Sequence, residues 1–277
     1  MAVASQLRRR DRRRRRYALA ARLGLVLLAL FATATQAFSQ SSIWPHPPTW
    51  ALLTPALTLG AVTAIDNTRS LYASYRAPLA DEARSDVQKA LVVALVTIGS
   101  QLHLPVEDLG GNVFVVRSAW LPDRHAPFWR RREYLHRYLR FRVTDDPQAS
   151  DIDWFRGKGV IGICWAEHRP EHAALAALAA RYGHSPLSDS QWERVPERSR
   201  WGLDRTEFVE MIGKYAEVLA VPIKDDDGAF LGCVAVDLKL GRRGARTPTV
   251  LDSPVVEGVV TTAASVISRR LQTGGVL

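Results

Sequence analysis

An arginine-rich block followed at once by a long apolar segment constrains this chain more than any other feature. Residues 1–16 contain eight arginines and one acid, Asp11, and so carry +7 of the chain's formal net charge of +9. Residues 17–38 contain Arg22 as their only charged residue. As a helix, these 22 residues would span about 33 Å, which matches the ~30 Å hydrocarbon core of a bilayer. The pattern predicts a basic cytoplasmic tail over 1–16 beside a membrane-spanning helix.

A second apolar segment, residues 49–65, follows after a short polar turn that carries no formal charge. Trp44 and Trp50 lie at its start, where the aromatic belt of a membrane helix is expected. Arginines lie outside both segments and not in the turn, which predicts that both ends are cytoplasmic. We therefore expect a two-helix membrane hairpin over 17–66. The protein would be a multi-pass protein of the cell membrane, with the lipid bilayer as a partner.

The same N-terminal residues are also compatible with a secretory signal. A signal peptide has the same layout as the arginines, the apolar core 23–32 and the small residues at 32–34. The twin arginines also resemble a Tat-type signal. The sequence does not decide whether the first segment is cleaved. If the second segment spans the membrane, the rest of the chain is cytoplasmic in either case. A basic tail can also bind phosphates nonspecifically, but no base-reading motif predicts recognition of a specific nucleic acid.

Residues 67–104 read as an amphipathic linker and first helix, with a break at Pro78. Apolar residues recur at spacings of three and four from residue 79, as on one face of a helix. They are Leu79, Ala83, Val87, Leu91, Leu95, Ile98 and Leu102. This face predicts packing on the chain's own domain. Its position between membrane and domain also suggests pairing with a second copy, as in a homodimer, although no sustained heptad run predicts a coiled coil.

Residues 105–277 alternate between strand-like and helix-like segments. Expected strands are 112–120, 134–143, 217–224 and 229–239; the last two are joined by the turn 225–228 (DDDG), a strong hairpin signal. Expected helices are 166–181, after a glycine turn, then 206–214 and 255–271, with a polar loop over 183–204. This order predicts an α+β domain in which helices flank an antiparallel sheet.

Three segments of this domain resemble the GAF family, a small-molecule sensing fold related to PAS domains. They are the glycine turn 157–162 (GKGVIG) before a helix, the final hairpin with 218–223 (VLAVPI) and 231–237 (LGCVAVD), and the closing helix. The resemblance covers about residues 79–271. It implies a pocket for a small molecule, such as a cyclic nucleotide, a tetrapyrrole, haem or a metabolite, and often dimerisation through the flanking helices.

No residue pattern identifies a particular ligand or cofactor. The asparagine-lysine-phenylalanine-aspartate signature of the cyclic-nucleotide subfamily is absent from the sequence. The resemblance places the pocket between the sheet and the segments 154–165 and 183–215. The pocket candidates are Trp154, Lys158, Trp165 and Tyr215.

Several polar clusters were weighed as sites. His168 and His172, at i and i+4 on the expected helix, have zinc-like spacing, but HEXXH is absent and a solvated helix face explains them equally well. The acidic run 225–227 fits a hairpin turn better than a calcium loop. The arginines at 130–132 fit a solvated loop, or a site for an anion, a phosphate or the lipid surface. We expect no metal site.

Two cysteines, Cys164 and Cys233, lie in apolar runs without a CxxC motif. They are expected to be buried, reduced thiols, with a disulfide as the alternative in an oxidising compartment. The sequence shows no Ser-His-Asp order, nucleophile elbow or phosphate loop, so no catalytic residue is predicted. The predicted function is a membrane-anchored cytoplasmic sensory module without catalytic activity, signalling through self-association or a partner of unknown identity. The alternatives are a ligand-free dimerisation scaffold and, less favoured, a cysteine-dependent redox enzyme.

Overall fold

The computed structural model describes residues 29, 33–34, 49–122, 129–150, 152–183, 186–241 and 249–274. The chain forms two compact units, Met1–Pro78 and Leu79–Leu277. Most of the first predicted span, 17–38, and the turn after it lie outside the described residues. Within the described residues, no helix combines the length and the apolar character that a bilayer crossing requires.

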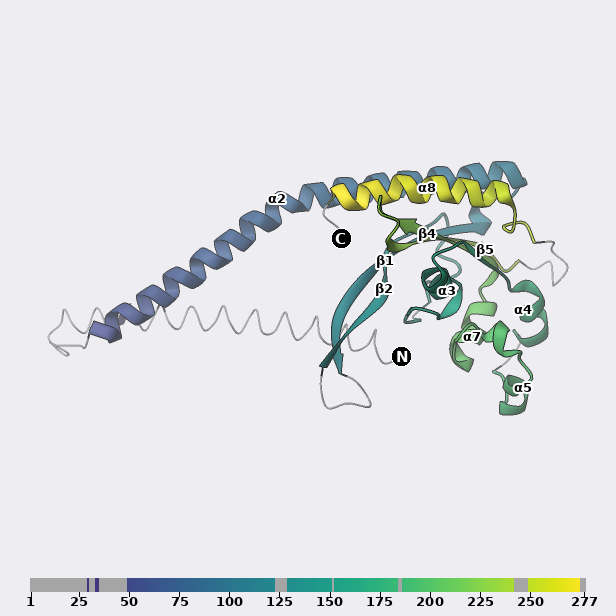
Figure 1. Cartoon of the computed structure of the whole chain (residues 1–277), viewed down its shortest axis with the longest axis horizontal. Helices are drawn as coiled ribbons and strands as arrows, with labels where there is room; N and C mark the ends of the chain where they lie inside the picture. Colours follow the sequence, from purple (N-terminus) through teal and green to yellow (C-terminus); the bar gives the residue numbers. More distant parts are fainter. Residues whose placement is uncertain are drawn as a thin grey trace. The chain divides into compact units, whose positions relative to one another are not determined.

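Helix α2 runs without interruption from Thr49 to Leu102 (Figure 1). The break predicted at Pro78 is therefore wrong. A proline removes one backbone hydrogen bond and bends a helix, but the turns on either side can continue it. The predicted stripe is confirmed from Ala83 onward, where Val87, Leu91, Leu95 and Ile98 are fully buried. Leu79 is 42% exposed and does not join them.

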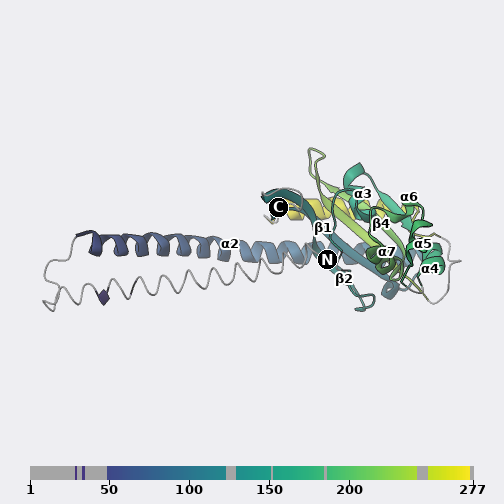
Figure 2. The ribbon, with the colours of Figure 1, turned by 90° about the horizontal axis from the view of Figure 1, so that it is seen from below.

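Five antiparallel strands form one sheet in the order β2-β1-β5-β4-β3. After the short helix η1 (Val106–Asp108), the strands are β1 (Leu109–Pro122), β2 (Trp129–Arg142), β3 (Glu171–Ala174), β4 (Tyr215–Lys224) and β5 (Phe230–Lys239). The expected hairpin is confirmed as β4 and β5, which pair from Tyr215↔Lys239 to Lys224↔Phe230, with a shift of register near each end. The predicted α+β fold with an antiparallel sheet is thus confirmed (Figure 2).

The remaining helices are α3 (Gly159–Glu167), α4 (Ala176–Tyr182), α5 (Asp189–Glu193), α6 (Glu197–Arg200), α7 (Arg205–Ile212) and α8 (Pro254–Thr273). The single helix predicted over 166–181 is wrong. His168 adopts a left-handed conformation (φ 54°) and ends α3, Pro170 prevents its continuation, and β3 precedes α4. The loop predicted over 183–204 contains α5 and α6, and the arginines at 130–132 lie on β2 rather than in a loop.

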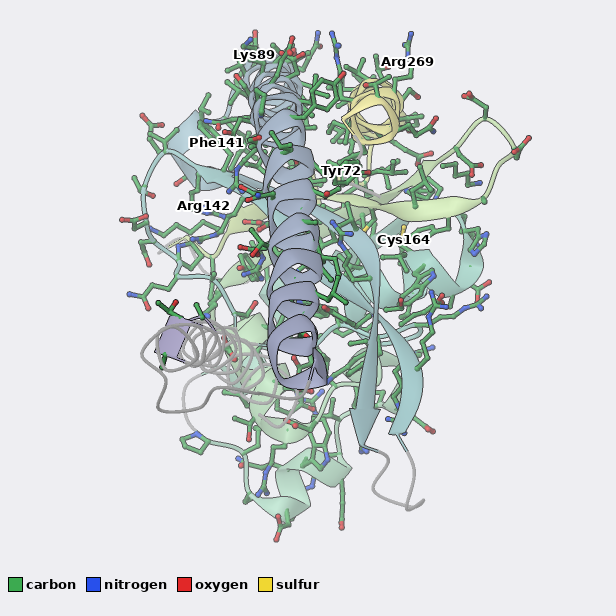
Figure 3. The ribbon with its side chains drawn as sticks, turned by 90° about the vertical axis from the view of Figure 1, so that its left-hand side faces the viewer. Tyr72, Lys89, Phe141, Arg142, Cys164 and Arg269 are labelled. Carbon is green, nitrogen blue, oxygen red and sulfur yellow. The ribbon has the colours of Figure 1, made fainter. Side chains whose placement is uncertain are left out.

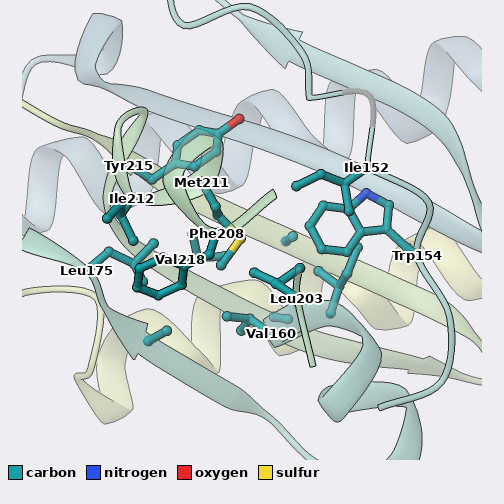
Figure 4. Packing of buried hydrophobic residues seen from close by; sticks show 14 of the residues in the cluster. Ile152, Trp154, Val160, Leu175, Leu203, Phe208, Met211, Ile212, Tyr215 and Val218 are labelled. Carbon is teal, nitrogen blue, oxygen red and sulfur yellow. The ribbon is translucent and has the colours of Figure 1, made fainter. Parts of the chain in front are cut away.

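The two faces of the sheet bury separate apolar clusters. On one face, α2 and α8 pack side by side against alternate residues of the strands, including Val113, Val115, Val234 and Val236; we call this cluster the helix-pair core. On the other face, α3, α4 and α7 cover Phe114, Val218 and Ala235. Figure 4 shows this second cluster around Phe208 and Met211 of α7. The candidate site lies within it.

Candidate functional site

A small cavity lies between the sheet and helices α3 and α7, with a volume of about 40 Å³. Its walls are Asn112, Phe114, Arg137, Ser150, Trp154, Val160, Ile161, Met211, Tyr215, Val218, Ala235 and Asp237. A buried water needs roughly 10–15 Å³ of such volume, whereas pockets for drug-sized ligands measure about 300–1,000 Å³. In this conformation the cavity has room for a few waters, and a larger ligand would require α7 or the 150–154 segment to move.

One wall of the cavity is a buried polar network. Asp237 is 4% exposed and accepts hydrogen bonds from Asn112 Nδ2 at 3.1 Å and from the guanidinium of Arg142. The side chain of Arg142 is labelled in Figure 3. Gly110 lies between the two strands that supply the ion pair, and a Cβ there would come within 2.7 Å of Asp237 Oδ1. The absence of a side chain at Gly110 is therefore what lets Arg142 reach Asp237. Burial lowers the pKa of Arg142, but an arginine remains charged at neutral pH.

Another part of the cavity lining combines a cation with aromatic rings. The guanidinium of Arg137 lies 5.4 Å from the centre of the Phe114 ring and donates to the carbonyl oxygen of Ser150. Trp154 meets Phe114 edge to face at 6.4 Å. The buried indole N–H of Trp154 has no hydrogen-bond acceptor among the described residues. A buried donor left unsatisfied is unfavourable, so an acceptor atom of a ligand or water would be stabilised here.

Local backbone geometry fixes Trp154 in this wall. Its carbonyl oxygen accepts from the N–H of Leu135 at 2.9 Å, which ties it to β2. Its ring lies against Gly159, where a Cβ would collide with it and where φ is +66°. Only glycine satisfies both conditions readily. The predicted glycine turn therefore positions Trp154 as well as starting α3.

The four residues predicted for the pocket divide into two pairs. Trp154 and Tyr215 line the cavity. Lys158 is the N-cap of α3, and its Nζ lies 2.6 Å from Glu207 Oε1, which joins the starts of α3 and α7. Trp165 is buried away from the cavity and stacks on Phe230 at 6.0 Å.

The polar residues of the cavity were missed by the sequence reasoning. Asn112 and Asp237 lie within apolar strands on the face that alternation turns toward α3, and this polar interruption of a buried strand was the available signal. Arg137 had a weaker signal, because β2 contains many arginines.

The other clusters serve structural roles. His172 lies on β3, not on a helix with His168, so the predicted i, i+4 arrangement is wrong. Its Nε2 is 3.0 Å from the buried carboxylate of Glu217. Asp225 Oδ1 accepts from the N–H groups of Asp227 and Ala229, so this acidic run builds the hairpin turn as expected. Among the described residues, no group of three or more His, Cys, Asp or Glu side chains is arranged to hold a metal ion.

Cys164 and Cys233 are neighbours in the core between α3 and β5, and both are free and fully buried. Burial is the main cause that raises the pKa of Cys233 well above the ordinary value, and its hydrogen bond and charge interaction with Cys164 add to this effect. Reaction requires the thiolate, which this environment disfavours.

We expect both thiols to resist iodoacetamide in the folded protein, reacting at least about a hundredfold more slowly than after unfolding in urea, because alkylation must wait for local opening. Mass spectrometry of the alkylated peptides measures this difference. Rapid labelling of either cysteine in the native protein would contradict the buried placement.

The chain is similar to several solved structures at low sequence identity. One is a type II free methionine-R-sulfoxide reductase from Thermoplasma acidophilum, with 11% identity and a TM-score of 0.39, over 70% of this chain and 94% of that one. Another is a protein described as a GAF sensor from Burkholderia vietnamiensis, with 15% identity and a TM-score of 0.33, over 73% and 98% of the two chains.

The same likeness extends to the GAF domain region of a protein described as a membrane protein from Geobacter sulfurreducens. Here the identity is 12% and the TM-score 0.36, over 71% of this chain and 99% of that one. No protein-family model and no curated protein sequence matches the chain. These neighbours include both a reductase and a protein described as a sensor, so the likeness assigns neither a ligand nor an activity to this chain.

Proposed function

We propose that the domain is a sensory module that binds a small molecule in the cavity between the sheet and α3 and α7, and that passes the signal to a partner or to a second copy without catalysing a reaction. The observation that carries this proposal is the buried, unsatisfied N–H of Trp154, which lines the same cavity as Asn112 and Asp237 of the ordered network with Arg142. Such a site offers directional polar contacts inside an apolar shell, which is the usual composition of a ligand pocket.

Mass spectrometry and absorption spectra of the natively purified protein test this proposal. We expect a co-purifying small molecule, and we expect Arg137→Gln to reduce its occupancy about tenfold or more, because a charged hydrogen-bond donor contributes roughly 1.5–3 kcal/mol. Arg181→Gln is the matched control, because Arg181 lies outside the cavity walls, over the Tyr182 ring. If the purified protein contains no small molecule, this assignment of the site is contradicted. It is also contradicted if both variants retain the ligand to the same extent.

A second candidate function, a dimerisation scaffold, is favoured by the outer surface of the helix pair. Val93 on α2 is 64% exposed and Val266 on α8 is 37% exposed, and both border a groove of about 480 Å³ between the two helices. Exposed valines along a shared groove favour association with a second copy.

Light scattering of the full chain tests this association. We expect a dimer, and we expect Val93→Glu to shift it to monomer, because the substitution buries a charge at the interface and weakens association by several kcal/mol. Gln88→Glu, at an exposed residue of the same helix that does not line the groove, is a charge-altering control. A wild-type monomer at all concentrations would count against both the scaffold and signalling by self-association.

Membrane attachment with both termini cytoplasmic is part of the proposal, and it is supported by the sequence of residues 1–66. The arginine block and the two apolar segments favour it. We also propose that the domain has no redox activity. Burial of both thiols, the raised pKa of Cys233 and the placement of both cysteines outside the cavity walls support this part of the proposal.

A further inference from the structure

Strands β1 and β2 continue beyond the sheet as a two-stranded arm. Pairing between β1 and β5 extends to Val115↔Gly232, whereas pairing between β1 and β2 continues to Pro122↔Trp129. We define the arm as residues 116–122 and 129–135. Figure 1 shows this ribbon leaving the sheet on the side of β2.

The arm carries more positive charge than the rest of the domain. Its charged residues are Arg117, Arg130, Arg131, Arg132 and Glu133, for a net charge of +3. Residues 17–277 together carry only +2, because 1–16 account for +7 of the total of +9. The rest of the chain, outside the tail and the arm, therefore has a net charge of −1. The positive charge of the arm is thus local and not a general property of the chain.

The arginines occupy both faces of the ribbon. Arg131 and Arg132 are exposed, and as neighbours on a strand they point to opposite faces. Arg132 pairs with Ala119, so Arg117, two residues away on β1, is its diagonal neighbour on the same face. Diagonal cross-strand neighbours lie about 7–8 Å apart, a spacing at which two guanidinium groups can share one phosphate.

His136, the residue that follows the arm on β2, has a lowered pKa. Burial is the main cause, and the charges of Arg117 in the arm and of Arg137 outside it add to the effect.

The residue types of the arm favour a lipid surface over a nucleic acid. Trp120, Leu121, Pro122 and Trp129 form its outer end, directly beside the arginines in the strand register. Tryptophan next to arginine is typical of the interface between headgroups and acyl chains. Arginine also reads guanine in a nucleic acid groove, so a DNA duplex is the competing occupant that the experiment must test.

We propose that the arm binds the phosphate-bearing headgroups of an anionic phospholipid surface, with Arg131 and Arg132 as the principal contacts. This inference goes beyond the proposed ligand cavity, and it is separate from the predicted anchor in residues 17–66. Arginines on an exposed edge strand also prevent that strand from pairing with a second copy of the chain. If this were their only role, the arm would not respond to the lipid composition of a vesicle.

A dye on the arm tests the proposal in the full chain. Ser118 is exposed on β1, and Ser118→Cys can carry an environment-sensitive fluorophore, while Cys164 and Cys233 are fully buried and will not take the label. The labelled protein is mixed with vesicles of phosphatidylcholine, alone or with phosphatidylglycerol. Flotation measures total attachment, including any through residues 17–66, whereas the dye reports the arm alone.

We expect the dye to respond only when phosphatidylglycerol is present, and the response to weaken as salt is raised. Arg131→Gln with Arg132→Gln should reduce apparent binding of the arm about thirtyfold, which corresponds to roughly 1 kcal/mol for each arginine near an anionic surface. Arg194→Gln with Arg198→Gln, two exposed arginines outside the arm, should leave the response unchanged.

Three results would overturn the proposal. A dye that stays silent while flotation shows attached protein would mean that the arm does not touch the bilayer. An equal response with phosphatidylcholine alone would mean that headgroup charge is not what it recognises. A response to a short DNA duplex but not to phosphatidylglycerol would assign the arm to a nucleic acid. None of these results bears on the ligand cavity.

Discussion

Replacing Asp237 by asparagine should destabilise the domain by about 3 kcal/mol. The substitution preserves the shape of the side chain but removes the charge that compensates Arg142, whose side chain is only 3% exposed. Breaking a buried ion pair by removing one partner costs about 3–5 kcal/mol, because the other charge is left in a poorly solvated site. The urea midpoint, followed by tryptophan fluorescence, measures the effect.

Two variants separate this effect from a general sensitivity to mutation. Arg205→Gln breaks the ion pair with Asp189, which is 93% exposed, and should change stability by less than about 0.5 kcal/mol. The double variant Arg142→Met with Asp237→Leu removes both charges and should recover much of the loss, as apolar replacements of buried pairs often do. If Asp237→Asn is as stable as the wild type, the pair does not support the fold.

Replacing Glu217 by glutamine should destabilise the domain by about 3 kcal/mol. The carboxylate, 3% exposed, accepts from the backbone N–H groups of Val250 and Leu251 at 2.9 Å and lies 3.0 Å from His172 Nε2. It therefore fastens the segment before α8 to β3 and β4. A glutamine would turn an N–H group toward donors, and hydrogen bonds to a charged group contribute about 1.5–3 kcal/mol. Urea unfolding measures the loss, and hydrogen exchange at Val250 and Leu251 should speed up.

This effect should depend on pH in a defined direction. Burial alone raises the pKa of Glu217, but hydrogen bonds from His172, Val250 and Leu251 outweigh it, so the folded pKa lies below the ordinary value of 4.5. The unfolded chain then binds more protons, and stability rises with pH over this range. The contribution of Glu217 is fully present above about pH 4.5 and is lost as the pH falls through the folded pKa. The stability difference between wild type and Glu217→Gln should narrow on acidification, and a constant difference down to pH 3 would contradict this mechanism.

Periodicity predicted the elements whose burial follows a regular pattern. The stripe on α2 and the β4–β5 hairpin were both confirmed, because helical spacing and a turn signal each depend on residues that are close together in the sequence. The single helix predicted from Ala166 to Arg181 was wrong for two reasons. The left-handed conformation of His168 ends α3, and the short strand β3 (EHAA) contains residues that also suit a helix. Local propensity alone could not distinguish a helix from a strand here, because β3 forms by pairing with the edge of β4.

The candidate site was predictable only in part. The family resemblance placed the pocket beside the segments 154–165 and 183–215, and Trp154 and Tyr215, at the ends of these segments, line the cavity. The hydrogen bond between Asn112 and Asp237 joins residues 125 apart in the chain, and Arg142 reaches Asp237 only because Gly110 leaves space between them. Such a network depends on strand order and register, which a single sequence specifies poorly.

The sheet is one backbone thick between the cavity and the helix pair. Along β1, Asn112 and Phe114 border the cavity while Val113 and Val115 belong to the helix-pair core, and β5 alternates in the same way. Any free energy of coupling between the two faces is therefore carried by shared peptide units rather than by a long relay. Such coupling is reciprocal, so an event that repositions α2 or α8 would change the affinity of the cavity by the same factor as a bound ligand changes the equilibrium of the helices.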